Sequence, residues 1–162
     1  MKKMFQKFLL AASLALSALL TAPMAHATSM TDYLETALIN HVFRATAFTA
    51  PTTLYIRLNT TACSDSASGT EVSGGSYARA AVTSGTGTWN AVSAGNGTTA
   101  NTSAITFATP SAGWGTVSHV EIMDAASAGN SLVCVALGTS KTINSGDTVT
   151  FPGGSLTFQI DN

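Results

Sequence analysis

Beyond Pro51 the apolar residues recur at every second position, in short runs separated by turn-forming residues. The segment "TTLYIRLNT", residues 52–60, places Leu54, Ile56 and Leu58 on one face of an extended chain, as a strand with one buried face requires. Similar candidates are, in order, "SYARAAVTS", "GTWNAV", "SAITFAT", "TVSHVEIMDA", "SLVCVALG", "DTVTF" and "SLTFQID". About eight short strands with no helical pattern between them predict a mainly β fold, an antiparallel β-sandwich of jelly-roll-like type.

One helical pattern precedes these strands, in "TDYLETALINHVFRAT", residues 31–46. Its core stripe recurs at three- and four-residue steps and consists of Leu34, Ala37, Leu38, His41, Val42 and Ala45. Asp32 and Glu35 lie in the first turn, where the helix dipole favours negative charge. We therefore expect an N-terminal helix within residues 28–46 and one β-sandwich domain over residues 47–162.

The first 27 residues have the layout of a secretory signal peptide. Lys2, Lys3 and Lys7 precede an apolar run from Phe8 to Leu20, and Ala25-His26-Ala27 forms a small-x-small cleavage site. The apolar run is shorter than the roughly 20 residues that a spanning helix needs. We expect cleavage after Ala27, export to the periplasm or the cell exterior, and no membrane association of the mature chain.

Few residues of the chain are charged, 9% in all. Without the leader its cations are Arg44, Arg57, Arg79 and Lys141, too few and too scattered to neutralise phosphates, so we expect no nucleic-acid partner. A surface with little charge has little self-repulsion, which favours packing against copies of the same chain. The composition thus favours a homo-oligomer.

The segment "SHVEIMD", residues 118–124, holds the best candidates for chemistry. On a strand His119 and Glu121 project to the same face, and Asp124 can turn in from the strand end. These residues are weak candidates for a metal site and hence for a metal-dependent hydrolase. The alternative, which the strand alternation favours, is an exposed polar face with Val120 and Ile122 buried behind it. We expect no catalytic residues and no cofactor.

Two tryptophans, Trp89 and Trp114, are candidates for ligand binding. Exposed aromatic rings can stack on sugars, so a second hypothesis is a secreted carbohydrate-binding module that recognises surface glycans. Aromatic area is more often used in packing, which favours a core or subunit-interface position for both. Arg79 is expected to pair with Glu71 or Asp124, or to face a neighbouring subunit.

The two cysteines, Cys63 and Cys134, are candidates for a disulfide. In an exported protein two cysteines usually pair, but Cys134 lies in the apolar run "SLVCVAL", where a buried thiol is also common. The sequence leaves both readings open, because pairing requires a geometry that sequence separation does not reveal.

From Met30 onward the chain resembles a family of small bacteriophage virion proteins, described as tail-fibre or tail-associated proteins. The resemblance lies in five segments: "MTDYLETALINHVFR", "PTTLYIRL", "GTEVSGGSYARAAVT", "ITFATPSAGWGTVSHVEIMDA" and "TSKTINSGDTVTFPGGSLTFQID". It implies a non-enzymatic structural or adhesive subunit of a virion, one that associates with itself or with other virion or fibre subunits. The leader is not part of the resemblance, so a virion component and an exported host protein both remain open.

Overall fold

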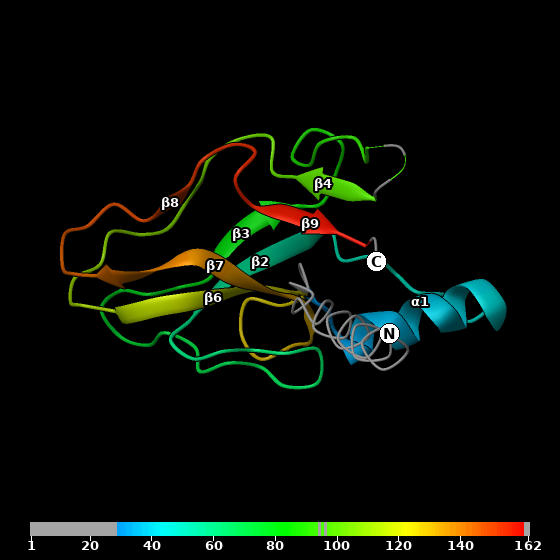
Figure 1. Ribbon diagram of the computed structural model, residues 1–162, viewed down its shortest axis with the longest axis horizontal. Helices are drawn as coiled ribbons and strands as arrows, with labels where there is room; N and C mark the ends of the chain where they lie inside the picture. The colour runs from blue at the N-terminus through cyan, green and yellow to red at the C-terminus, as the bar shows by residue number, and fades with distance from the viewer. Residues whose placement is uncertain (1–28, 94, 96, 161–162) are drawn as a thin grey trace, which may run out of the picture.

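The computed structural model describes residues 29–93, 95 and 97–160, so the predicted signal peptide and its cleavage site lie outside the described residues. The elements, in chain order (Figure 1), are β1 (Ser29–Met30), α1 (Asp32–Phe43), β2 (Thr53–Asn59), β3 (Ala80–Thr83), β4 (Thr98–Ala100), β5 (Ile105–Thr106), β6 (Gly115–Met123), β7 (Ser131–Ile143), β8 (Thr150–Phe151) and β9 (Thr157–Gln159).

The strands form one five-stranded sheet in the order β1-β7-β6-β2-β3 and two small ladders, β4-β9 and β5-β8. Every pairing is antiparallel. The prediction of a mainly β, antiparallel fold with one helix near the N-terminus is therefore confirmed. The jelly-roll-like arrangement of the strands stays a prediction.

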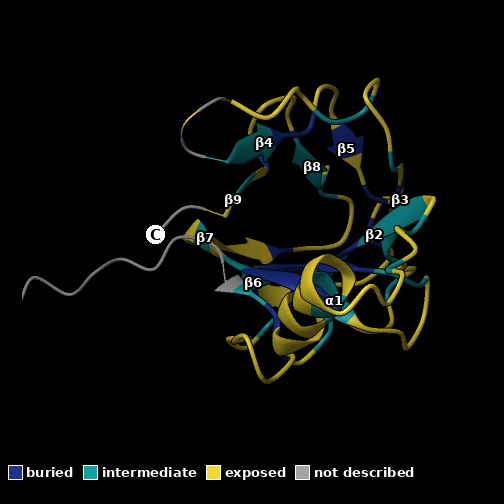
Figure 2. Ribbon diagram, turned by 90° about the vertical axis from the view of Figure 1, so that its right-hand side faces the viewer, coloured by how far each residue is buried: buried dark blue, intermediate teal, exposed yellow. Residues whose placement is uncertain are grey.

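The hydrophobic core lies between the five-stranded sheet on one side and the two ladders on the other. Figure 2 shows the sheet and the ladders facing each other. Ile56 and Leu58 of β2 point into it, as the alternation of "TTLYIRLNT" predicts. Val120 and Ile122 of β6 join them, because the register pairs Ile56 with Ile122 and Leu58 with Val120. One register therefore places all four side chains on the same face of the sheet.

The opposite face of the sheet is also covered. Helix α1 lies on that side (Figure 2), and Cys63 ties the loop after β2 to β7 through a disulfide with Cys134. Val120 and Glu121 of β6 are both fully buried although they point to opposite faces. The alternation of the strand predicted an exposed polar face that includes Glu121. That prediction is wrong for Glu121, because this face of the sheet is covered as well.

Helix α1 begins and ends with recognisable caps. Thr31 is the N-cap, and its Oγ1 accepts a hydrogen bond from the backbone N–H of Leu34 at 3.5 Å, as a helix start favours. At the other end the backbone N–H groups of Arg44 and Thr46 both donate to the Asn40 carbonyl. The helix therefore ends at Phe43, before the predicted 46. No helix among the described residues has the length and apolar content to cross a membrane.

Three details of the strand prediction were wrong. "GTWNAV" forms no strand, because Trp89 makes only an isolated bridge to Asn101, while β4, at Thr98–Ala100, falls in a segment that the sequence indicated as a turn. Strand β7 is longer than "SLVCVALG" and continues to Ile143.

Candidate functional site

The three residues proposed for a metal site do not converge. His119 and Glu121 lie on one face of β6, as predicted, but the His119 Nδ1 contacts the Ser118 Oγ at 2.9 Å. Asp124 lies past the end of the strand and accepts hydrogen bonds from the backbone and side-chain nitrogens of Asn130, at 2.7 and 2.8 Å. Within the described part of the chain, no three His, Cys, Asp or Glu side chains are placed to hold a metal ion.

Glu121 instead belongs to a buried charge cluster, defined here as Arg57, Asn59, Glu71, Tyr77, Arg79 and Glu121. Asn59 is the last residue of β2 before the loop over residues 60–79, which we call the covering loop. Its Nδ2 donates to Glu121 Oε2 at 2.6 Å. The Arg57 Nε lies 3.5 Å from the same oxygen. A buried carboxylate needs such partners, since removing an unpaired charge from water is costly. Glu121 Oε1 has no hydrogen-bond partner among the described residues.

Glu71 links the two arginines of the cluster. Its carboxylate accepts two hydrogen bonds from Arg79, from Nε and Nη2, both at 2.8 Å, and its Oε2 lies 3.4 Å from Arg57 Nε. Burial alone would raise the pKa of Glu71, but the hydrogen bonds and charge of Arg79, the charge of Arg57 and the Tyr77 hydroxyl together hold the pKa below its ordinary value of 4.5. Glu71 is thereby kept ionised near neutral pH.

Arg79 also fixes the turn between β6 and β7. Its Nη1 donates to the carbonyls of Ala125 and Ala128, both at 2.8 Å. Of the three partners considered from the sequence, the structure places Glu71 against Arg79, and the turn is held through backbone carbonyls rather than through Asp124. One guanidinium thus fastens two loops to the sheet, a task that suits its planar set of donors.

Tyr77 connects the charge cluster to the aromatic part of the core. Its hydroxyl accepts from the Leu58 backbone N–H at 2.9 Å and donates to Glu71 Oε1 at 3.3 Å. Burial, reinforced by the charge of Glu71, raises the pKa of Tyr77, so the hydroxyl keeps its proton. The ring packs edge-on against Trp114, with centroids 5.2 Å apart.

The two tryptophans, the candidates for sugar stacking, differ in burial. Trp114 is 4% exposed, and its indole N–H donates to the Gly75 carbonyl at 2.9 Å. Trp89 is half-buried and packs against the core, and its indole nitrogen is buried without a partner among the described residues. Both positions agree with packing, the use that aromatic area most often has.

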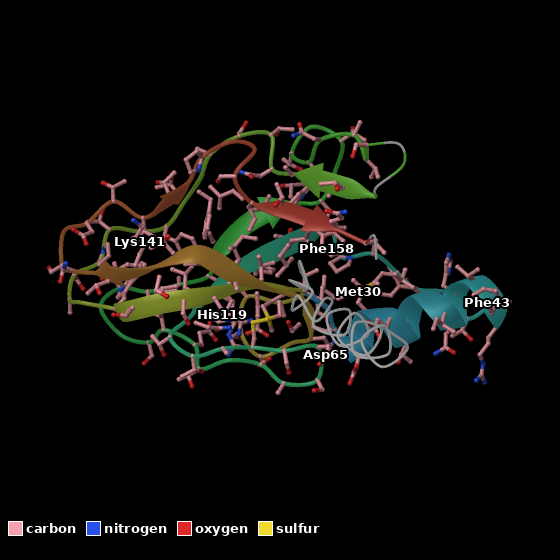
Figure 3. All side chains as sticks on the ribbon, in the orientation of Figure 1. Met30, Phe43, Asp65, His119, Lys141 and Phe158 are labelled. Atoms are coloured by element: carbon pink, nitrogen blue, oxygen red, sulfur yellow. A yellow bond between two sulfur atoms is a disulfide. The ribbon has the colours of Figure 1, made fainter. Side chains whose placement is uncertain are left out.

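Cys63 and Cys134 form a disulfide with a Cα–Cα distance of 5.9 Å. Cys134 lies on β7, opposite Glu121 in the register of the sheet, so the bond fastens the covering loop directly beside the buried charge cluster. Figure 3 shows the sulfur atoms beneath the sheet, not far from the His119 label.

A groove of about 370 Å³ opens between β7 and β8. Its lining is mainly apolar and includes Leu58, Val117, Leu137, Ile143, Val149 and Phe151. Lys141 is the one titratable residue in the lining, which also contains the hydroxyls of Thr139, Thr150 and Ser155, so the groove lacks the cluster of titratable side chains that is typical of a catalytic site.

The sequence model of a family described as Podophage GP4 fiber I protein gp80 matches residues 29–159. The chain belongs to this fibre protein family. The match begins at β1 and covers α1, all the strands and both halves of the disulfide. No curated protein sequence matches the chain.

Membership of the gp80 fibre family supports a structural protein of a phage virion, and it confirms the resemblance noted from the sequence. The sequence did not reveal that Arg57, Asn59 and Tyr77 belong to one cluster. A signal was present, because Arg57 and Asn59 alternate with core residues and so share the other face of their strand. Their partners lie far away in the chain, however, so no local sequence pattern identifies them.

Proposed function

We propose that the chain is a non-enzymatic structural or adhesive subunit of a phage fibre, displayed on the virion, that associates with itself or with other fibre subunits. The observation that carries the proposal is the family match over residues 29–159. The site geometry supports it, because Arg57, Arg79, Glu71 and Glu121 meet in ion pairs that hold loops rather than in an open pocket.

The hydrolase alternative gains no support from the arrangement of its residues. His119, Glu121 and Asp124 each bond to a different partner, whereas a hydrolytic metal needs about three ligands around one point. Trp114 does not support the carbohydrate-binding alternative, because its ring is buried and cannot stack on a sugar. A structural role needs neither arrangement.

The disulfide supports a location outside the reducing cytoplasm, where disulfides persist. We infer that the mature chain reaches such a place either through the predicted leader or as part of a released particle. In both cases Cys63 and Cys134 meet an oxidising environment after synthesis, and the covering loop is then fixed covalently.

Particle composition tests the proposal. Cells that carry the gene are induced to release phage, the particles are banded in a density gradient, and an antibody raised against the chain is used for immunogold electron microscopy. We expect gold on fibres of intact particles. Antigen found only in particle-free fractions would overturn the virion role.

A further inference from the structure

Three exposed apolar side chains form a continuous patch on the outer half of α1. Ile39 is 57%, Val42 67% and Phe43 80% exposed, and their spacing of three and four residues places them side by side on a helix surface. We call these three residues the distal helix patch. Figure 3 shows Phe43 at the tip of α1, away from every strand. So large an apolar cluster at a projecting tip indicates an interaction site.

The helix is fastened at one end only. At its start β1 pairs with β7, the Thr31 backbone N–H donates to the Leu132 carbonyl at 3.1 Å, and the Asp32 N–H donates to the Asp65 carbonyl at 3.0 Å. No residue of α1 itself is buried, and Figure 1 shows the helix projecting along the long axis beyond the sheets. Its first turn therefore holds the patch in a fixed direction, clear of the sandwich.

The outer half of α1 is also a weak helix by itself. Ile39, His41, Val42 and Phe43 all have lower helix propensity than alanine or leucine, and isolated helices shorter than about 12 to 15 residues are marginal in water. Tertiary packing usually supplies the missing stability, but here the core does not reach the outer turns. Packing against another molecule would supply it.

Charge and area both fit a second copy as that molecule. From Thr36 to Phe43 the helix carries no Asp, Glu, Lys or Arg, so two patches can meet without repulsion. With the two patches centred on each other and the helices antiparallel, Glu35 of each lies about one helical turn along the axis from Arg44 of the other, so these opposite charges approach each other. The patch exposes on the order of 400 Å² per copy, so a pair with its flanking residues reaches the roughly 1,000 Å² of a specific interface.

We propose that the distal helix patch is a self-association surface, on which α1 of one chain packs antiparallel against α1 of a second copy about a two-fold axis. The inference rests on the proposed function, because it names the surface through which the fibre subunit self-associates. A two-fold contact uses the same patch on both copies, and the projecting helices place the two sandwiches at opposite ends of the pair.

Glutamine substitutions test the surface without weakening the helix. The full chain, purified as the cell processes it, is compared with Ile39→Gln and Phe43→Gln by size-exclusion chromatography with light scattering and by sedimentation over a range of concentrations. Glutamine is a better helix former than isoleucine or phenylalanine but removes apolar surface. Val92→Gln is the matched control, since Val92 is 65% exposed and precedes Ser93, which bridges Thr98 of β4.

We expect the wild type and the control to be dimeric, each single variant to raise the dimer dissociation constant at least about tenfold, and the double variant to be monomeric. Helical circular dichroism of the wild type should fall on dilution. An unchanged dimer in the double variant would overturn the inference while leaving the fibre role intact. A monomeric wild type would overturn self-association itself. Absence from particles, in contrast, tells against the virion role alone.

Discussion

Single residues decide how the covering loop is held on the sheet. Arg57 stands between two carboxylates, and Arg79 binds one of them through two parallel hydrogen bonds. A buried ion pair often contributes little net stability, because desolvation offsets the attraction, yet it penalises every arrangement that leaves one partner unpaired. The cluster thus favours one position of the loop over alternatives.

The lowered pKa of Glu71 predicts a stability loss in acid. The folded state holds the proton less tightly than the unfolded chain, so the stabilisation is complete above about pH 4.5 and is lost as pH falls through the folded pKa. Glu71→Gln should therefore be less stable than wild type at neutral pH, and the difference should shrink below pH 4.5. Urea unfolding at several pH values measures it.

A Glu71→Gln curve that stays parallel to that of wild type through the acidic range would show that the pairing with Arg79 does not stabilise the folded state.

Gly75 and Gly74 form a matched pair for a second prediction. Both have positive φ, 54° and 73°, so alanine at either position costs about 1 kcal/mol in backbone strain. A Cβ at Gly75 would also lie 2.8 Å from the Ala112 carbonyl oxygen and 3.0 Å from Trp114 Nε1, whereas at Gly74 nothing lies within 4 Å.

We therefore expect Gly75→Ala to lower the free energy of unfolding by about 3 kcal/mol, since overpacking adds to the strain, and Gly74→Ala by about 1 kcal/mol. Chemical denaturation followed by tryptophan fluorescence compares them. Equal losses would mean that Ala112 and Trp114 move aside for the added methyl group at no cost in free energy of unfolding.

At the scale of elements, the disulfide is the strongest link between the covering loop and the sheet. It joins residues 71 apart in sequence, and closing so long a loop in the unfolded chain corresponds to about 4 kcal/mol. Cys63→Ser should lower the free energy of unfolding by up to that amount, and reduction of the wild type should have a similar effect. Denaturation with and without reductant checks both, and a wild type insensitive to reduction would contradict the prediction.

The elements also show which parts of the fold can be predicted from sequence. Strand β2 and the start of α1 follow from local patterns, since alternation and an N-cap act within a few residues. Strand β4 could not be found, because "NGTTAN" carries turn residues and becomes a strand only by pairing with β9. The burial of Glu121 was likewise hidden, since the loop that covers it begins some 60 residues earlier in the chain and is held there by side chains.

On the scale of the whole molecule, the sheet has one apolar face and one polar face, and both are covered. The apolar face meets the two ladders, while the polar face meets the loop and the inner end of α1. The outer end of α1 is then the large apolar feature left without cover among the described residues. The helix prediction located this element, but its free position could not be inferred from its apolar stripe, which is typical of a helix packed on a core.

The bond between Cys63 and Cys134 also makes a closed covalent ring of the chain between them. A protease that cuts within the ring, for example in the exposed turn at Thr86 and Gly87, opens the ring but separates no fragment. Such a nicked chain should run at full length on a non-reducing gel and split in two on a reducing one, whereas Cys63→Ser should split on both. A fibre subunit with this ring would therefore remain one covalently linked molecule after a first cleavage within it.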